Sequence, residues 1–88
     1  MDKHITYFDK DTLIDANNEA IRKKRNRALN PEALALLDEE CKFPVVWSMY
    51  HNDQEVRVKL MLSPNDSAWL DVSFDTFHSL PTIAMPTH

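Results

Sequence analysis

The most regular hydrophobic pattern in this chain begins at Val45, where apolar side chains recur at every second position. Such alternation is typical of a half-buried β-strand. Two alternating runs, Val45–Tyr50 and Val56–Leu62, flank Asn52-Asp53, which predicts a hairpin with a two-residue turn. Pairing across this turn gives one wholly apolar face, with Met49 opposite Val56, Trp47 opposite Val58 and Val45 opposite Leu60.

A third strand follows a second turn at Ser63–Ser67. If this turn closes as a five-residue loop, the apolar face continues, with Leu60 opposite Leu70, Val58 opposite Val72 and Val56 opposite Phe74. On the other face the same register pairs Lys59 with Asp71 and Met61 with Trp69. Because a slip by one residue would mix the two faces, the pattern favours this register strongly. It predicts a three-stranded antiparallel meander over residues 45–74.

Two helices are predicted before the meander. A 3.6-residue spacing of apolar positions predicts the first over Thr12–Leu29, with Asp9 or Asp11 as its N-cap. Asn30-Pro31 starts a second helix that extends to about Glu40, since asparagine caps helices well and proline fits the first helical position. We therefore predict a two-layer α+β fold with both helices packed on one face of the sheet.

The two ends of the chain complete this picture. The short β-prone segment His4–Phe8 predicts an edge strand, which gives a sheet of three to four strands. Asp75–Leu80 predicts one helical turn capped by Asp75, so residues 1–80 form a single domain. Residues 81–88 contain two prolines and no apolar period. We expect them to be a mobile C-terminal tail.

Composition excludes several kinds of chemistry. The 88 residues include no glycine, and without glycine neither a phosphate-binding P-loop nor a dinucleotide-binding turn can form. No apolar run approaches the roughly 20 residues that span a bilayer, and Cys41 is the single cysteine. We therefore expect a cytoplasmic protein without a membrane segment. The four histidines show no spacing typical of metal ligands, so no metal, no cofactor and no enzymatic activity are expected.

Charge is unevenly distributed along the chain. The net charge is −4, yet residues 1–30 carry an excess of basic groups and residues 31–88 an excess of acidic ones. Five cations fall within six positions: Arg22, Lys23, Lys24, Arg25 and Arg27. They suit a contact with phosphate or with an acidic protein. They suit better the solvated end of a helix whose dipole favours cations there, since they point in all directions around the helix.

The polar face of the predicted sheet is a second candidate surface. It carries Tyr50, Arg57, Lys59, Trp69 and Ser73, and Trp69 forms an apolar patch with Met61 and Val46. Aromatic residues between cations can stack nucleobases. Glu55 and Asp71 share this face, however, and aromatic residues and methionine are enriched at the cores of protein interfaces. We therefore interpret Tyr50, Arg57, Met61 and Trp69 as partner-binding residues for a protein.

These observations favour a small non-enzymatic binding or regulatory protein. It would act through protein–protein interaction, as an adaptor or inhibitor of a larger assembly, and self-association into a homodimer is a further expectation. The alternative hypothesis is a nucleic-acid-binding accessory protein that uses the basic segment Arg22–Arg27. A third hypothesis is that the acidic remainder imitates nucleic acid and occupies a basic groove on another protein.

Overall fold

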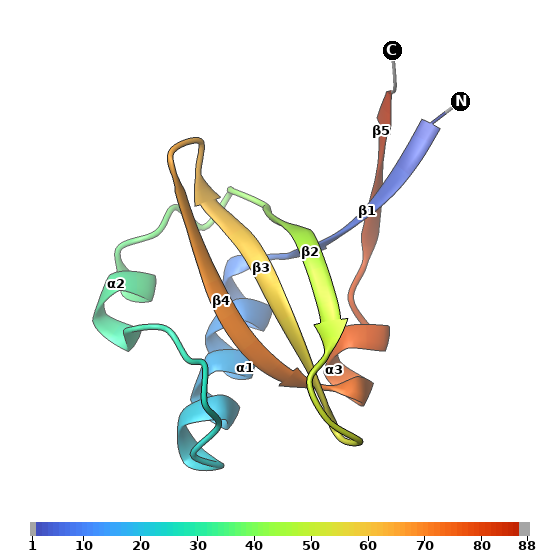
Figure 1. The fold of residues 1–88 in the computed structure, drawn as a ribbon. Helices are drawn as coiled ribbons and strands as arrows, with labels where there is room; N and C mark the ends of the chain where they lie inside the picture. The colour runs from blue at the N-terminus through green and yellow to red at the C-terminus, as the bar shows by residue number, and fades with distance from the viewer. Residues whose placement is uncertain (1, 87–88) are drawn as a thin grey trace.

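The computed structural model describes residues 2–86 and shows an α+β fold built on one antiparallel sheet (Figure 1). The strands are β1 (Asp2–Phe8), β2 (Phe43–Tyr50), β3 (Glu55–Ser63), β4 (Asp66–Ser73) and β5 (Thr82–Pro86), and the helices are α1 (Lys10–Arg22), α2 (Pro31–Ala35) and α3 (Phe74–His78). The sheet has five strands in the order β4-β3-β2-β1-β5, rather than the predicted three to four. The predicted α+β class is confirmed.

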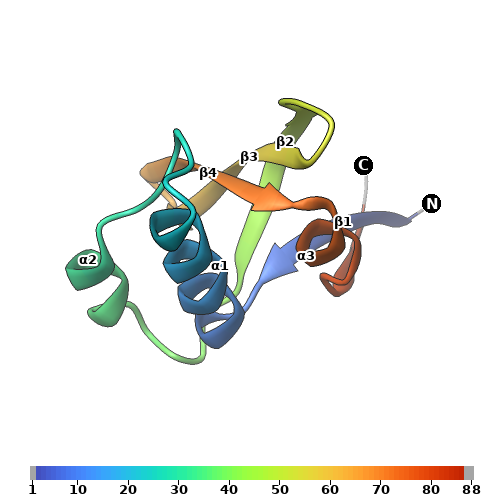
Figure 2. The ribbon, with the colours of Figure 1, turned by 90° about the horizontal axis from the view of Figure 1, so that it is seen from below.

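The hydrophobic core lies between the sheet and α1. The apolar residues at alternate positions of β3 and β4 are buried, and they face the buried stripe of α1. The buried apolar residues are Phe8, Leu13, Ala16, Ala20, Leu34, Phe43, Val56, Val58, Leu60, Leu70, Val72 and Leu80. Burying one large apolar side chain contributes about 1.5–3 kcal/mol, so this layer holds the helix on the sheet. Among the described residues no helix lies on the opposite face of β2, β3 and β4, here called the open face (Figure 2).

The register between β2 and β3 differs from the prediction over half of the hairpin. Val45 pairs with Leu60 as predicted, but a bulge follows it, and Trp47 then pairs with Lys59. The extra residue turns Trp47 and Met49 to the open face. The register differs near the turn because the loop between β2 and β3 is longer than the predicted two residues. The backbone N–H of His51 donates to the carbonyl of Glu55 at 2.9 Å.

The register between β3 and β4 is shifted by two residues from the prediction. The connection is a tight turn, with Ser63 paired to Asp66, rather than a five-residue loop. A shift of two keeps every side chain on its predicted face but changes its neighbour across the strands. Arg57 therefore lies opposite Asp71, and Lys59 lies opposite Trp69.

Helix α1 ends at Arg22, seven residues before the predicted end. Lys24 adopts a left-handed conformation with φ of 54°, which turns the chain out of the helix. The N–H of Arg25 then donates to Ala20 at 2.9 Å and that of Lys24 to Ile21 at 3.1 Å, closing a Schellman motif. Glycine usually occupies the left-handed position that ends a helix in this way. Because lysine occupies it here, the sequence pattern does not predict the end of α1.

Lys24→Gly is expected to raise the free energy of unfolding by about 1 kcal/mol, because glycine adopts the left-handed region without the Cβ clash. Lys24→Ala, which keeps the clash and removes the same charge, is the matched control and should leave stability nearly unchanged. Urea denaturation of the three proteins measures the difference. A Lys24→Gly variant less stable than Lys24→Ala would contradict the assignment.

Helix caps follow the prediction in two of three cases. The side chain of Asp9 accepts the N–H of Thr12 at 2.8 Å, and that of Asn30 accepts the N–H of Glu32 at 2.9 Å. Helix α3 is capped by Ser73, not by Asp75 as predicted, because α3 begins one residue before Asp75. Helix α2 ends at Ala35 and does not continue to Glu40.

The Asp9 cap makes stability depend on pH. Accepting the Thr12 N–H lowers the pKa of the Asp9 carboxyl from its ordinary value of 3.8. A folded-state pKa below the unfolded one means that the stabilisation is present above pH 3.8 and is lost as the pH falls through the lower folded value. Asp9→Ala is expected to cost about 1 kcal/mol at pH 7. Asp9→Asn should keep most of the cap and weaken this acid dependence, as denaturation at pH 7 and pH 3 can measure.

The C-terminal segment corrects the prediction of a mobile tail. Thr82–Pro86 forms β5, which pairs with β1 from Thr6 to Asp2. Pairing along a neighbouring backbone does not require alternation of side chains, so the sequence pattern offers no sign of it. Residues 87–88 of the predicted tail lie outside the described residues.

Candidate interaction surface

Two tryptophans form the centre of the open face. Trp47 of β2 and Trp69 of β4 pack edge to face, with ring centroids 5.8 Å apart and an interplanar angle of 85°. They are 51% and 36% exposed, and the neighbouring Met49 is 43% exposed. Large aromatic side chains usually bury most of their surface in a folded protein. Here two of them are in contact with each other and with solvent.

Lysine and methionine border this aromatic pair. Lys59 of β3 reaches over Trp69, with its Nζ 5.9 Å from the ring centroid, and Met61 is half-buried beside it on the same strand face. We call Trp47, Met49, Lys59, Met61 and Trp69 the Trp patch. Nearby, Lys42 Nζ lies 5.7 Å above the ring of Tyr7. Neither lysine forms an ion pair within residues 2–86.

The structure brings together three of the four residues interpreted as partner-binding. Arg57, Met61 and Trp69 lie on the open face. Tyr50 does not, because the bulge in β2 turns it to the other face, where its ring packs against Phe74 at 5.3 Å. The alternation of side chains predicts Trp47 and Met49 in the core. A bulge has no sequence signal in this segment, so their exposure emerges only from the structure.

Arg57 is held in place by Asp71. The guanidinium Nε lies 2.9 Å from Oδ1 and Nη2 lies 3.2 Å from Oδ2, while Asp71 is fully buried. The hydrogen bonds that Arg57 donates to the Asp71 carboxylate raise the pKa of Arg57. Nη2 also lies 3.2 Å from Nε2 of His51. Arg57 is therefore part of an internal ion pair, with little capacity left for a partner.

The five cations of the basic segment Arg22–Arg27 do not form one surface. Arg25 is 6% exposed; its Nη2 lies 3.1 Å from Glu19 and its Nε 2.8 Å from Glu55. Lys23 also pairs with Glu19, at 3.5 Å, but remains about half exposed. Partial burial opposes these effects on Glu19, yet the hydrogen bond and charge of Arg25, with Lys23, lower its pKa. Only Arg22, Lys24 and Arg27 of the set are exposed without an ion pair in the described part of the chain.

The segment after α1 also covers the outer edge of β4. The carbonyl of Arg27 accepts the backbone N–H of Asp71 at 3.0 Å. Inside the fold, the side chain of Asn17 bonds both backbone groups of Leu29, accepting its N–H at 2.6 Å and donating to its carbonyl at 2.9 Å. The segment is thus fixed at Arg27 and at Leu29. It protects one edge of the sheet from pairing with other strands.

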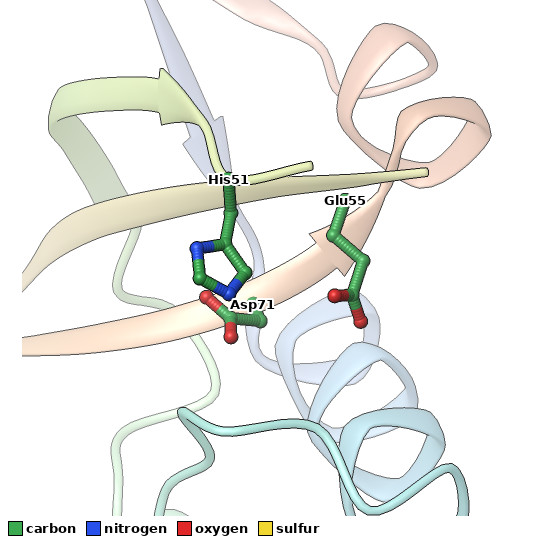
Figure 3. A group of neighbouring side chains, drawn as sticks. All are labelled: His51, Glu55 and Asp71. Atoms are coloured by element: carbon green, nitrogen blue, oxygen red, sulfur yellow. The ribbon is translucent and has the colours of Figure 1, made fainter. Parts of the chain in front are cut away.

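One group of side chains has the composition of a metal site. Ligand atoms of His51, Glu55 and Asp71 lie within 4.8 Å of one another (Figure 3). Both carboxylates already pair with a guanidinium, Glu55 with Arg25 and Asp71 with Arg57. A divalent cation would have to compete with these two fixed positive charges. The group is therefore explained as an ion-pair network that joins the segment after α1 to the sheet.

Comparison of the chain with known protein families, with curated proteins and with solved structures finds no match. Within residues 2–86, no helix is long and apolar enough to cross a membrane. Function is therefore inferred from the surfaces of this molecule itself.

Proposed function

We propose that this chain is a small protein-binding module that docks on a partner through the Trp patch, as an adaptor or inhibitor of a larger assembly. The observation that carries this is the pair Trp47 and Trp69, which pack against each other yet remain 51% and 36% exposed. Tryptophan is the residue most enriched among the energetic hot spots of interfaces, and methionine is enriched around them. An exposed pair on a helix-free sheet face is typical of such a centre.

Charge indicates the chemistry of the partner. The carboxylates of Glu55 and Asp71 on this face are each paired with an arginine. Lys59 remains free of such a pair in the described chain. A partner with an apolar centre and acidic groups at its rim would complement this surface.

The same charge disfavours self-association through the Trp patch. A two-fold dimer brings the same patch of both copies together. Lys59 of one copy would then approach Lys59 of the other, while Glu55 and Asp71 on this face are already paired with arginines. A different protein therefore fits the patch better than a second copy.

Nucleic acid is the second candidate, and two features weigh against it. Lys59 covers part of the Trp69 ring, so less of that ring is open for a base to stack on. In the basic segment Arg25 is buried in ion pairs, and the net charge of the whole chain is −4. Both features weaken binding that depends on phosphate contacts.

Affinity capture with matched variants tests the proposal. Trp47→Ala/Trp69→Ala should lose a protein that the wild type retains from a nuclease-treated extract of the native host. Loss of a hot-spot tryptophan costs about 2 kcal/mol or more, which is roughly 30-fold in affinity. Arg22→Ala/Arg27→Ala removes two exposed cations and should retain the protein at wild-type level.

Three results would contradict the proposal. One is that the Arg22→Ala/Arg27→Ala variant alone fails to retain the host protein. Another is that the wild type no longer captures this protein once the extract is treated with nuclease. The third is a dimer of the wild type in sedimentation that the tryptophan variant abolishes, which would assign the patch to self-association. Circular dichroism of both variants confirms that their folds are intact.

A further inference from the structure

Strands β1 and β2 are neighbours in the sheet but pair over a short stretch. Their register consists of Tyr7 with Pro44 and Phe8 with Phe43. Beyond these pairs, β1 continues along β5 and β2 continues along β3. Figures 1 and 2 show the ribbon of β1 and β5 leading away from β2. The separation starts beside the bulge that follows Val45. Two strand edges thus face a gap within one sheet.

The backbone groups along β2 can be assigned from alternation. In an antiparallel ladder, successive residues direct their N–H and C=O groups to opposite neighbours. The backbone N–H of His51 donates to Glu55 of β3. By alternation, the backbone N–H and C=O groups of Ser48 and Tyr50 therefore point away from β3, into the gap. Neither residue has a pairing partner on that side within residues 2–86.

The facing edge of β1 is arranged in the same way. The N–H of Tyr7 donates to the carbonyl of Pro81 at 3.1 Å, on the β5 side. Alternation then directs the backbone groups of His4 toward β2. The register of β1 with β2 ends before His4. Both walls of the gap thus carry unpaired donors and acceptors, which an extended peptide could satisfy.

The gap is hollow and lacks protection against added strands. A cavity of about 380 Å³ lies between the walls, with Phe77 of α3 and Trp47 of β2 among its lining residues. A smaller hollow of about 120 Å³ adjoins it beside Ser48 and Tyr50. Sheet edges are usually protected by charges, prolines or covering segments. Residues 45–50 of β2 contain neither charge nor proline, whereas the outer edge of β4 is covered by the segment after α1.

We propose that the partner inserts an extended segment into this gap, as an added strand that pairs with the free edge of β2. The inference rests on the proposed function, because Trp47 belongs to both the Trp patch and the gap. Main-chain hydrogen bonds to Ser48 and Tyr50 supply affinity, and the hollow beside them selects an apolar side chain. Since β1 and β2 are antiparallel, one added strand runs parallel to one of them and antiparallel to the other.

Amide hydrogen exchange, followed by NMR, tests this in the free protein first. Ser48 and Tyr50 should exchange at least tenfold faster than Met49, whose amide faces β3. Slow exchange at Ser48 and Tyr50 without ligand would mean that the gap is closed in solution, which overturns the proposal. Slowing that grows with protein concentration would assign the edge to a second copy and overturns it equally.

The second arm uses peptides of 12 residues selected from a random display library against the wild type. A selected peptide should slow exchange at Ser48 and Tyr50 at least tenfold. Ser48→Pro removes one donor from the free edge and leaves the β3 ladder intact, so it should weaken binding at least tenfold. Ser48→Ala, which keeps the N–H, should bind as the wild type does. If Ser48→Pro fails to fold, the exchange data on the wild type decide.

The outcomes separate this inference from the proposed function. A peptide that shifts the indole signals of Trp47 and Trp69 without slowing Ser48 and Tyr50 overturns strand addition and leaves docking on the Trp patch standing. A library that yields no enriched peptide also overturns strand addition. Capture that is insensitive to the tryptophan substitutions contradicts the proposed function, whatever the exchange data show.

Discussion

Arg57→Ala is expected to lower the free energy of unfolding by about 3–5 kcal/mol, the range for removing one partner of a buried ion pair. Asp71 is fully buried, and its carboxylate receives both hydrogen bonds from Arg57. Without Arg57 a negative charge is left in the protein without its counter-ion. The loss is a large share of the roughly 4–13 kcal/mol that typical values per residue give for a chain of 88 residues.

Urea denaturation monitored by tryptophan fluorescence measures this loss. Lys59→Ala is the matched control, because Lys59 is a cation on the same strand face that contacts a ring rather than a carboxylate; it should cost below about 1 kcal/mol. Arg57→Met/Asp71→Leu removes both charges and should recover most of the stability, since apolar pairs replace buried ion pairs well. An Arg57→Ala variant within 1 kcal/mol of wild type would contradict this role.

Asn17→Ala is expected to cost about 2–4 kcal/mol, because it leaves two part-buried backbone groups without partners. The Asn17 side chain is fully buried and bonds both the N–H and the carbonyl of Leu29. It thereby fixes the segment that turns back from the end of α1. Loss of these bonds should also loosen the cover over the edge of β4.

Thermal unfolding measures the Asn17 effect, with a fall in Tm of about 10 °C or more for a domain of this size. Asn18→Ala is the control, since Asn18 is the exposed neighbour on the same helix; its Tm should change by less than about 2 °C. Equal stability of the two variants would show that the Asn17 bonds contribute nothing to the fold.

The alternation of side chains predicted much of the sheet because it reports burial directly. Val56, Val58, Leu60, Leu70 and Val72 all face the core as the pattern requires. The shift of two residues between β3 and β4 leaves these faces unchanged. Alternation cannot detect such a shift, so it could not predict that Asp71 pairs with Arg57.

Three features could not be predicted because they depend on the backbone or on distant residues. The bulge after Val45 exposes Trp47, although the pattern places that residue in the core. Lys24 ends α1 in the left-handed conformation, a position that glycine usually occupies. Asn17 falls on the apolar stripe of α1, and only its bonds to Leu29 explain a buried amide there.

The candidate site was predicted in part for the same reason. Trp69 and Met61 were placed correctly on a common face, since their strands follow the alternation. The alternation predicts the wrong face for Tyr50, because the bulge after Val45 exchanges the faces of the residues that follow it. Sequence spacing also cannot show that Arg25 of the basic segment folds back to Glu19 and Glu55.

Site-specific photo-crosslinking in the native host tests the central claim most directly. A photoreactive residue in place of Met49 lies within the Trp patch, and one in place of Arg27 lies on the exposed basic segment. Docking on the Trp patch predicts a light-dependent adduct with a protein from position 49 and none from position 27. An adduct from position 27 alone, or an adduct with nucleic acid from either position, would contradict it.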